Sequence, residues 1–332
     1  MCRMAQIVLG LCSSHSPQLS TDAEVWPEHG ANDQGNPWLI DKTGRHLSYA
    51  EALTQADPRI RDELTPEHHA RRHATVQAAV ARLQRALADA APDAVVVFGD
   101  DQAEIFSSDF RPALMIYSGQ RVPNMPDLFT RAKYEAGRKA GWAYGPEGAT
   151  IPIQSSLAQH LVGQLIEAGF DLAHAGHLDN GLGLGHAFGF VYGRLMNGHV
   201  APLVPVIINT LYPPNQPTAR RCYELGEAVR MAIASWPGEA RVAVVGSGGL
   251  SHFLIDEQID QQFLEAVRNR DREAICALPA QRLQSGTGEL RSWIAAVAAA
   301  ADLRLDFVEY QACYRSPAGS GMGMGFALWT EH

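Results

Sequence analysis

The sequence has few cysteines, and they do not fall into a binding or bridging pattern. There are five in 332 residues, widely spaced, and no two of them are separated by only two residues. A disulfide framework uses an even set, and a thiolate zinc site uses closely spaced pairs. Both are therefore excluded, and we expect a protein of a reducing, cytoplasmic compartment.

Long apolar runs and basic clusters are also missing. No hydrophobic stretch approaches the roughly 20 residues that span a bilayer, and residues 1–10 lead into a strand-like run without a charged leader. The chain has 27 Lys and Arg against 36 Asp and Glu, a formal net charge of −9. Because an acidic chain is repelled by a phosphate backbone, we expect neither a nucleic-acid nor a membrane partner.

The apolar content is sufficient for a full core, with 46% hydrophobic residues. It is arranged as unbroken apolar runs that alternate with segments of helical periodicity. The runs are residues 5–12, 93–98, 113–117, 202–210 and 241–245, and the helical segments are 66–91, 153–168, 218–235, 259–269 and 288–300. This alternation predicts an α/β fold with a mainly parallel or mixed central sheet and helices on both faces.

Two stretches fall outside this alternation. Residues of about 21–66 are polar and rich in turn formers, so we interpret them as a surface segment inserted into one catalytic domain of residues 1–332. We place His29 and His69 on the surface. Residues 119–150 are loop-like, and a last short strand is expected at residues 326–329.

Polar side chains follow several predicted strands. His15, the acidic turn that begins at Asp100, Tyr212 and His252 all stand just after an apolar run. Ligands of parallel sheets lie beyond the carboxyl ends of the strands, so these side chains should converge. His15 either presents its imidazole to a cleft or satisfies a strand-end carbonyl.

The residues around His252 favour a catalytic role for this histidine. Glycines precede it at residues 246–249, and a histidine after such a loop suits a general acid or base. Glu289 opens the predicted helix 288–300, where carboxylates are also common because of the helix dipole. Two histidines and one carboxylate form the facial triad that holds non-haem iron(II) and leaves positions open for substrate and O₂.

Several segments, in order, resemble class III extradiol ring-cleavage dioxygenases, the family of the protocatechuate 4,5-dioxygenase beta subunit. They are GLCSSHSP at 10–17, NTLYPP at 209–214, RCYELG at 221–226, GSGGLSH at 246–252, GELRSW at 288–293 and YRSPAG at 314–319. The resemblance covers most of the chain except about residues 21–66. It implies Fe²⁺ bound by His15 and Glu289, with His252 as the acid/base that acts on a catechol-like or aminophenol-like ring and O₂.

Two positions depart from the family pattern. Gln102 stands where the family has its second iron histidine, and Asn180 stands near the place of its substrate-side histidine, for which His186 can substitute. The predicted metal ligands are therefore His15, Gln102 and Glu289, the catalytic residues His252, His186 and Asp101, and the substrate contacts Asn180, His186 and Tyr212. A homodimer is expected from base rates.

The departure at Gln102 leaves other interpretations open. An amide oxygen is a weaker ligand for iron(II) than an imidazole. Either Asp101, Gln102 or a histidine from elsewhere completes the site, or the metal is lost. Without metal, the scaffold would serve a hydrolase or lyase in which His15, His252 and the turn at residues 100–102 activate water. A non-enzymatic binding relative is the third interpretation, although binding alone does not require a base at His252.

Overall fold

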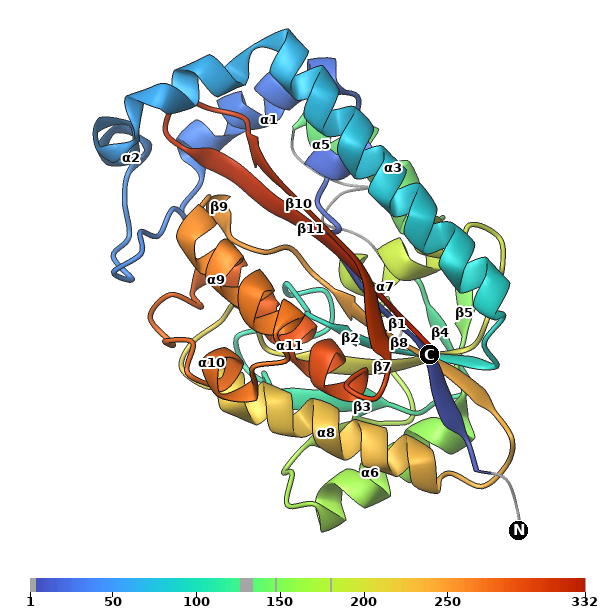
Figure 1. The fold of residues 1–332 in the computed structure, drawn as a ribbon. Coiled ribbons are helices and arrows are strands. Elements are labelled where there is room, and N and C mark those ends of the chain that lie inside the picture. Colours follow the sequence, from blue (N-terminus) through green and yellow to red (C-terminus); the bar gives the residue numbers. More distant parts are fainter. Residues whose placement is uncertain (1–3, 126–133, 147, 180, 332) are drawn as a thin grey trace.

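The computed structural model describes residues 4–125, 134–146, 148–179 and 181–331, and within them a mixed nine-stranded sheet forms the centre (Figure 1). Its order is β10–β11–β1–β8–β2–β7–β3–β6, with β9 paired to β11. The strands are β1 (Gln6–Ser13), β2 (Ala94–Gly99), β3 (Leu114–Tyr117), β6 (Ala173–Ala175), β7 (Leu203–Ile208), β8 (Arg241–Ser247), β9 (His252–Leu254), β10 (Arg304–Tyr314) and β11 (Ser320–Thr330). A separate antiparallel pair comprises β4 (Arg121–Pro123) and β5 (Thr150–Pro152).

The middle of the sheet is parallel, as the unbroken apolar runs predict. β1, β8, β2 and β7 pair in parallel, whereas β3 and β11 run antiparallel to their neighbours β7 and β1. Every residue of β2 is buried, and its side chains alternate between two cores. Val96 and Phe98 face one core, and Val95 and Val97 face the other. The α/β prediction with both faces covered is confirmed.

Helices cover both faces of the sheet (Figure 1). One core is closed by α6 (Ser155–Glu167), α8 (Ala219–Ser235), α9 (Glu257–Arg268), α10 (Arg272–Cys276) and α11 (Leu290–Ala299). The other is closed by α3 (Pro66–Ala90), α7 (His186–Phe190) and the π-helix Val191–Leu195, with α5 (Glu135–Lys139) near them. Within the described part of the chain, no helix combines the length and apolarity needed to cross a membrane.

The segment of residues 21–66 carries α1 (Trp26–Asn32) and α2 (Tyr49–Gln55), and it lies beside the far end of the β10–β11 hairpin (Figure 1). His29 in this segment and His69 in α3 correct one expectation, because they are 1% and 3% exposed, so neither lies on the surface. His29 Nε2 contacts Thr21 Oγ1 at 3.1 Å, and the His69 ring packs against Trp26. A polar composition concealed this burial because each imidazole is enclosed by neighbours distant in sequence. That residues 21–66 are an insertion stays a prediction.

The carboxyl-terminal hairpin is larger than expected. The short strand expected at residues 326–329 belongs to β11, which extends over Ser320–Thr330 and pairs with an unexpected partner, β10. Glycine lowers intrinsic strand preference and concealed β11. A Cβ at Gly323 would lie 2.2 Å from Asp260 Oδ2, so close packing against α9 requires this glycine. The loop expected at residues 119–150 likewise contains β4, β5 and α5.

Candidate metal centre

Four buried side chains from distant parts of the chain meet where β1, β2 and β8 end. They are His15, Asp100, His186 and Glu289, each at most 2% exposed. Each offers one nitrogen or oxygen atom, and these atoms all lie within 4.8 Å of one another. The convergence expected from strand-end positions therefore occurs for His15 and Asp100. Two ligands that share one ion at about 2.1 Å are separated by roughly 3 to 4 Å, so a small contraction would place all four around one ion.

The position of the His15 ring follows from its contact with Ser247. The Ser247 hydroxyl donates to the carbonyl of Ala187 at 2.7 Å, so its oxygen accepts from His15 Nδ1 at 3.0 Å. Nδ1 of His15 is thereby committed as a donor to Ser247, so Nε2 is the nitrogen that would be free to coordinate a metal ion. Nε2 lies 3.3 Å from Glu289 Oε2. This arrangement, with one ring nitrogen bonded to the protein and the other directed inward, is typical of metal-binding histidines.

Glu289 joins His15 to His252. It closes a 3₁₀ turn, Ser285–Glu289, that leads into α11. Its Oε2 also accepts from the amide of Gly249 at 2.6 Å, and its Oε1 lies 3.2 Å from His252 Nε2. Burial would raise the pKa of Glu289, but His252 and His15 outweigh it and hold this pKa well below its ordinary range. Glu289 is therefore a carboxylate at neutral pH.

His252 is oriented by a backbone carbonyl on one side of its ring and by a carboxylate on the other. Its Nδ1 donates to the carbonyl of Leu250 at 2.8 Å, which leaves Nε2 to face Glu289 and the cavity. Burial lowers the pKa of His252, but the charge of Glu289 and its hydrogen bond outweigh burial and raise this pKa above its usual value. Gly286, in the 3₁₀ turn that ends at Glu289, must be a glycine, because a Cβ at this position would lie 2.1 Å from His252 Cδ2.

A second acidic group faces His186. Glu104 Oε1 accepts from both Nδ1 and the backbone nitrogen of His186, at 2.6 and 2.8 Å. Burial opposes the charged imidazole, but Glu104 and Asp100 outweigh it and raise the pKa of His186 to about 10. Burial, followed by the charge of Glu289, raises the pKa of Asp100. The two acidic groups at this strand end thus belong to the same constellation as His15.

Asp101 and Tyr212, which were also selected from the sequence, have their contacts elsewhere. The carboxylate of Asp101 accepts from the amides of the following turn, at Ala103, Ile105 and Phe106. Tyr212 packs under the guanidinium of Arg111, 3.5 Å from the ring centre, and does not line the cavity. Asn180 lies outside the described residues. Catalytic and substrate roles for these residues stay predictions.

A cavity of about 110 Å³ opens directly onto His15, His252 and Glu289. It is comparable with the cavity of about 150 Å³ that holds a benzene molecule in another protein. Its remaining walls combine apolar and polar side chains, namely Ser16, Pro17, Gln102, Tyr134, His186, Phe253, Arg315, Gly321 and Met322. A single aromatic ring matches both the size and the composition of this space.

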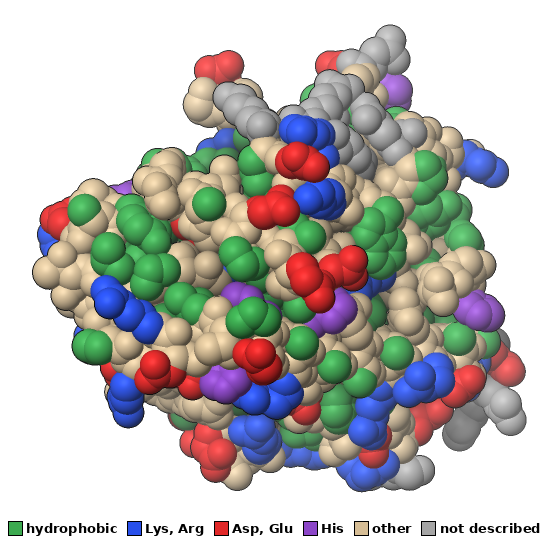
Figure 2. Space-filling model, turned by 90° about the horizontal axis from the view of Figure 1, so that it is seen from above, with side chains coloured by type: hydrophobic (Ala, Val, Ile, Leu, Met, Phe, Trp, Pro, Cys, Tyr) green, Lys and Arg blue, Asp and Glu red, His purple; other side chains and the backbone are tan. Residues whose placement is uncertain are grey.

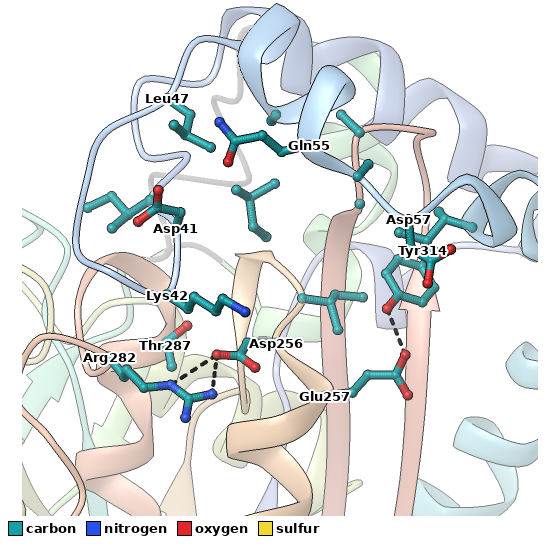
Figure 3. A pocket seen from close by; sticks show the side chains of 18 of the residues that line it. Asp41, Lys42, Leu47, Gln55, Asp57, Asp256, Glu257, Arg282, Thr287 and Tyr314 are labelled. Carbon is teal, nitrogen blue, oxygen red and sulfur yellow. Dashed lines mark hydrogen bonds and ion pairs between the residues drawn. The ribbon is translucent and has the colours of Figure 1, made fainter.

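A larger hollow, of about 320 Å³, lies between the segment of residues 21–66 and the body of the protein (Figure 3). Three of its charged side chains have partners within it: Arg282 donates to Asp256, and the hydroxyl of Tyr314 donates to Glu257 (Figure 3). None of the four metal-centre residues lines it. The face shown in Figure 2 carries interspersed acidic and basic side chains without a large patch of one sign. The smaller cavity is therefore where the chemistry is concentrated.

Comparison with known proteins agrees with this geometry. A family model described as the catalytic LigB subunit of aromatic ring-opening dioxygenase matches residues 58–325. This chain belongs to the LigB family. The resemblance to class III extradiol dioxygenases that the motifs indicate is thereby confirmed.

Individual relatives match this chain over only part of its length. A 2,3-dihydroxyphenylpropionate/2,3-dihydroxicinnamic acid 1,2-dioxygenase of Azotobacter vinelandii is 29% identical over 219 residues, 64% of this chain and 62% of that protein. One from Cupriavidus necator is 32% identical over 181 residues, 53% of this chain and 50% of that protein. A gallate dioxygenase of Pseudomonas putida is 43% identical over 74 residues, 20% of this chain and 22% of that protein. The chain thus spans about half to three fifths of the dihydroxyphenylpropionate enzymes.

The sequence analysis did not assign three contributors to this LigB site, although it expected the acidic turn that begins at Asp100 at this edge of the sheet. Ser247 and Glu104 hold the imidazoles of His15 and His186, and Asp100 presents a carboxylate to the centre. Asp100 was noticed only as part of a polar turn. Its position directly after an unbroken apolar strand was the available signal, but the side chain it faces, His186, lies 86 residues away, and no local pattern pairs the two.

Proposed function

We propose that this chain opens the ring of a small catechol-like or aminophenol-like aromatic compound with O₂, using iron(II) held by His15 and Glu289. One observation carries the proposal. His15 Nε2 and Glu289 Oε2 lie 3.3 Å apart on the wall of a cavity that has room for one ring. The dioxygenase names of the LigB relatives support the reaction class.

The donor set fits a divalent ion. Imidazole nitrogen and carboxylate oxygen are the ligands of the facial triad of non-haem iron(II) enzymes. Asp100 Oδ1 is buried and accepts no hydrogen bond from the described residues. Iron bound by His15 and Glu289 would supply open positions at which an aromatic diol and O₂ meet.

The chain's own residues handle the proton and the ring. His252 has its Nδ1 proton committed to the carbonyl of Leu250, so proton exchange with a substrate hydroxyl takes place at Nε2, the atom that faces the cavity. Phe253 and Met322 line the same cavity and provide apolar surface for an aromatic ring. Because the metal-centre side chains are almost wholly buried, bulk water reaches them poorly.

The test is direct. Protein purified without oxygen and loaded with iron(II) should consume O₂ with catechol or 2-aminophenol and produce the absorbance of an opened ring. His252→Gln should retain the metal and lose turnover. A parent protein that binds less than about a tenth of an equivalent of iron and consumes no O₂ with any catechol contradicts the proposal.

A second candidate, a metal-free hydrolase or lyase, is favoured by Gln102. Its side-chain nitrogen donates to Asp100 Oδ2 at 3.1 Å and to Glu289 Oε1 at 3.2 Å, so the amide bridges two carboxylates that a cation would otherwise bridge. Treatment with EDTA separates the two candidates. If chelation abolishes activity and iron(II) restores it, the metal-free candidate fails.

Three further expectations belong to this proposal. A homodimer, a cytoplasmic location and a lid or partner role for residues 21–66 stay predictions. Light scattering of the purified protein tests the first, because a dimer would have twice the 36.1 kDa mass of one chain.

A further inference from the structure

The carboxylates around the metal centre depend on protonated imidazoles for their positive charge. Asp100, Glu104 and Glu289 have side chains at most 3% exposed, and their ion-pair partners in the described part of the chain are histidines. Histidine is positive only when protonated, and burying carboxylates without a matching positive charge is costly. A divalent cation among these groups would supply that charge.

Only one of the two carboxylate oxygens of Asp100 accepts hydrogen bonds from the described residues. Its Oδ2 accepts from Gln102 Nε2 at 3.1 Å and from Thr210 Oγ1 at 3.4 Å. Its Oδ1 accepts no hydrogen bond from the described residues, although the residue is 1% exposed. A buried carboxylate oxygen without a donor requires an explanation. This oxygen lies 3.7 Å from His186 Nε2, on the side of the centre.

His186 is oriented in the way that metal-binding imidazoles are. Glu104 accepts at its Nδ1, so Nε2 is the nitrogen that faces Asp100 and the ring of His15, whose centre is 4.7 Å from that of His186. A carboxylate that fixes the far nitrogen is the usual support of a ligand histidine. Gly185 leaves space for the Glu104 carboxylate, because a Cβ at Gly185 would lie 2.0 Å from the Glu104 carboxyl carbon.

Gln102 presents a hydrogen-bond donor to this centre, whereas a metal ligand must present a lone pair. Its amide nitrogen, a hydrogen-bond donor, lies against the carboxylates of Asp100 and Glu289. Because both neighbours are acceptors, their chemistry requires the NH₂ group on this side whichever way the amide is drawn. In this orientation the amide stabilises the two ligand carboxylates and does not coordinate an ion.

We propose that Asp100 and His186 bind the divalent ion in this chain together with His15 and Glu289, and that they replace the ligand lost at Gln102. This inference rests on the proposed function only in assuming that an ion binds. It goes further in assigning a ligand set of two imidazoles and two carboxylates, with Gln102 as a residue that positions the carboxylates.

Cobalt(II) tests the assignment without turnover. The full-length protein, stripped with a chelator, is titrated with Co²⁺ by calorimetry and visible absorption, and the variants Asp100→Asn and His186→Gln are compared with Gln102→Ala, a change in the same constellation. Each of the first two should bind Co²⁺ at least about tenfold more weakly and alter the cobalt bands, whereas Gln102→Ala should stay within about threefold of the parent. Parent affinity in either of the first two variants, or a larger loss in Gln102→Ala, overturns the assignment.

A measurement on the folded parent guards against variants that fail to fold. His15 and His186 both carry a proton on Nδ1, so coordination through Nε2 gives each a strongly shifted, exchangeable N–H signal in the proton NMR spectrum of the cobalt protein. Both signals should be present in the parent, and His186→Gln should lose one of them. A parent spectrum whose only shifted imidazole N–H belongs to His15 overturns the role of His186.

Failure of this inference is distinguishable from failure of the proposed function. If the parent binds iron and opens a catechol ring while Asp100→Asn and His186→Gln keep their cobalt affinity, only the ligand assignment fails. If the parent binds neither Co²⁺ nor iron(II), both fail together.

Discussion

Two buried polar clusters in this protein balance their charge in different ways. In one, Arg315 donates to Asp33 through two nitrogens at 2.7 and 2.8 Å, and Ser320 donates to the same carboxylate. In the other, Asp100 and Glu289 face imidazoles and one amide. Arginine is always charged, so the first cluster is complete as it stands. The second is complete only with protons or a cation, and this incompleteness supports the proposal that it is the functional one.

The comparison predicts that removing a carboxylate has different consequences in the two clusters. Glu289→Gln should lower kcat/KM for ring cleavage by about 10⁴-fold or more, because a metal ligand is lost. The free energy of unfolding of the metal-free protein should fall by less than in the Arg315 cluster, because imidazoles that lose Glu289 can release their protons, whereas a guanidinium cannot. Steady-state kinetics and urea unfolding in chelator measure both. Preserved turnover in this variant would contradict the assigned role of Glu289.

In the Arg315 cluster the effect should be on stability. Asp33→Asn leaves the guanidinium buried without its counter-ion and should lower the free energy of unfolding by about 3 to 5 kcal/mol, as measured by urea denaturation. Asp302→Asn is the control, because Asp302 pairs with Arg230 at 2.6 Å but its side chain is 75% exposed. The control should unfold like the parent. Equal stability of the two variants would show that the pairing of Asp33 with Arg315 does not stabilise the fold.

The same region should make the protein sensitive to acid through His29. Burial, followed by the charge of Arg315, lowers the pKa of His29 to about 3. A histidine with a lowered pKa contributes stability above its unfolded pKa of about 6.5, and this contribution is lost as the pH falls towards 3. Between pH 7.5 and pH 5 the loss is about 2 kcal/mol. His29→Gln should lose less over this interval in urea titrations at the two pH values, and an identical loss would exclude His29 as the source.

The smallest expected effect concerns the support of His15. Ser247→Ala removes the hydroxyl that accepts from His15 Nδ1, and it should weaken Co²⁺ binding by about tenfold while the ligand set stays intact. Calorimetric titration measures it, and the cobalt bands should keep their shape. A changed band shape would mean that Ser247 affects the coordination itself.

Much of this fold could be predicted because its signals are local. β2 is an unbroken β-branched run, and α3 begins at a capping threonine and repeats its apolar residues at spacings of three and four. Only the end of β11 was predicted, because Gly323 in its middle is explained only by α9, which packs against it. The pairing of Asp33 with Arg315 crosses 282 residues, and no local pattern indicates it.

For the site, strand-end position and motif were enough to select His15, His252 and Glu289, because the carboxyl ends of parallel strands share one edge of a sheet. The contacts of Asp100, Glu104 and His186 required the folded chain. Whether a carboxylate after a strand caps a turn, as Asp101 does, or faces the candidate metal centre, as its neighbour Asp100 does, depends on which residues from elsewhere fill the space in front of it. Strand order and helix packing determine that space, and neither is encoded in a local stretch of residues.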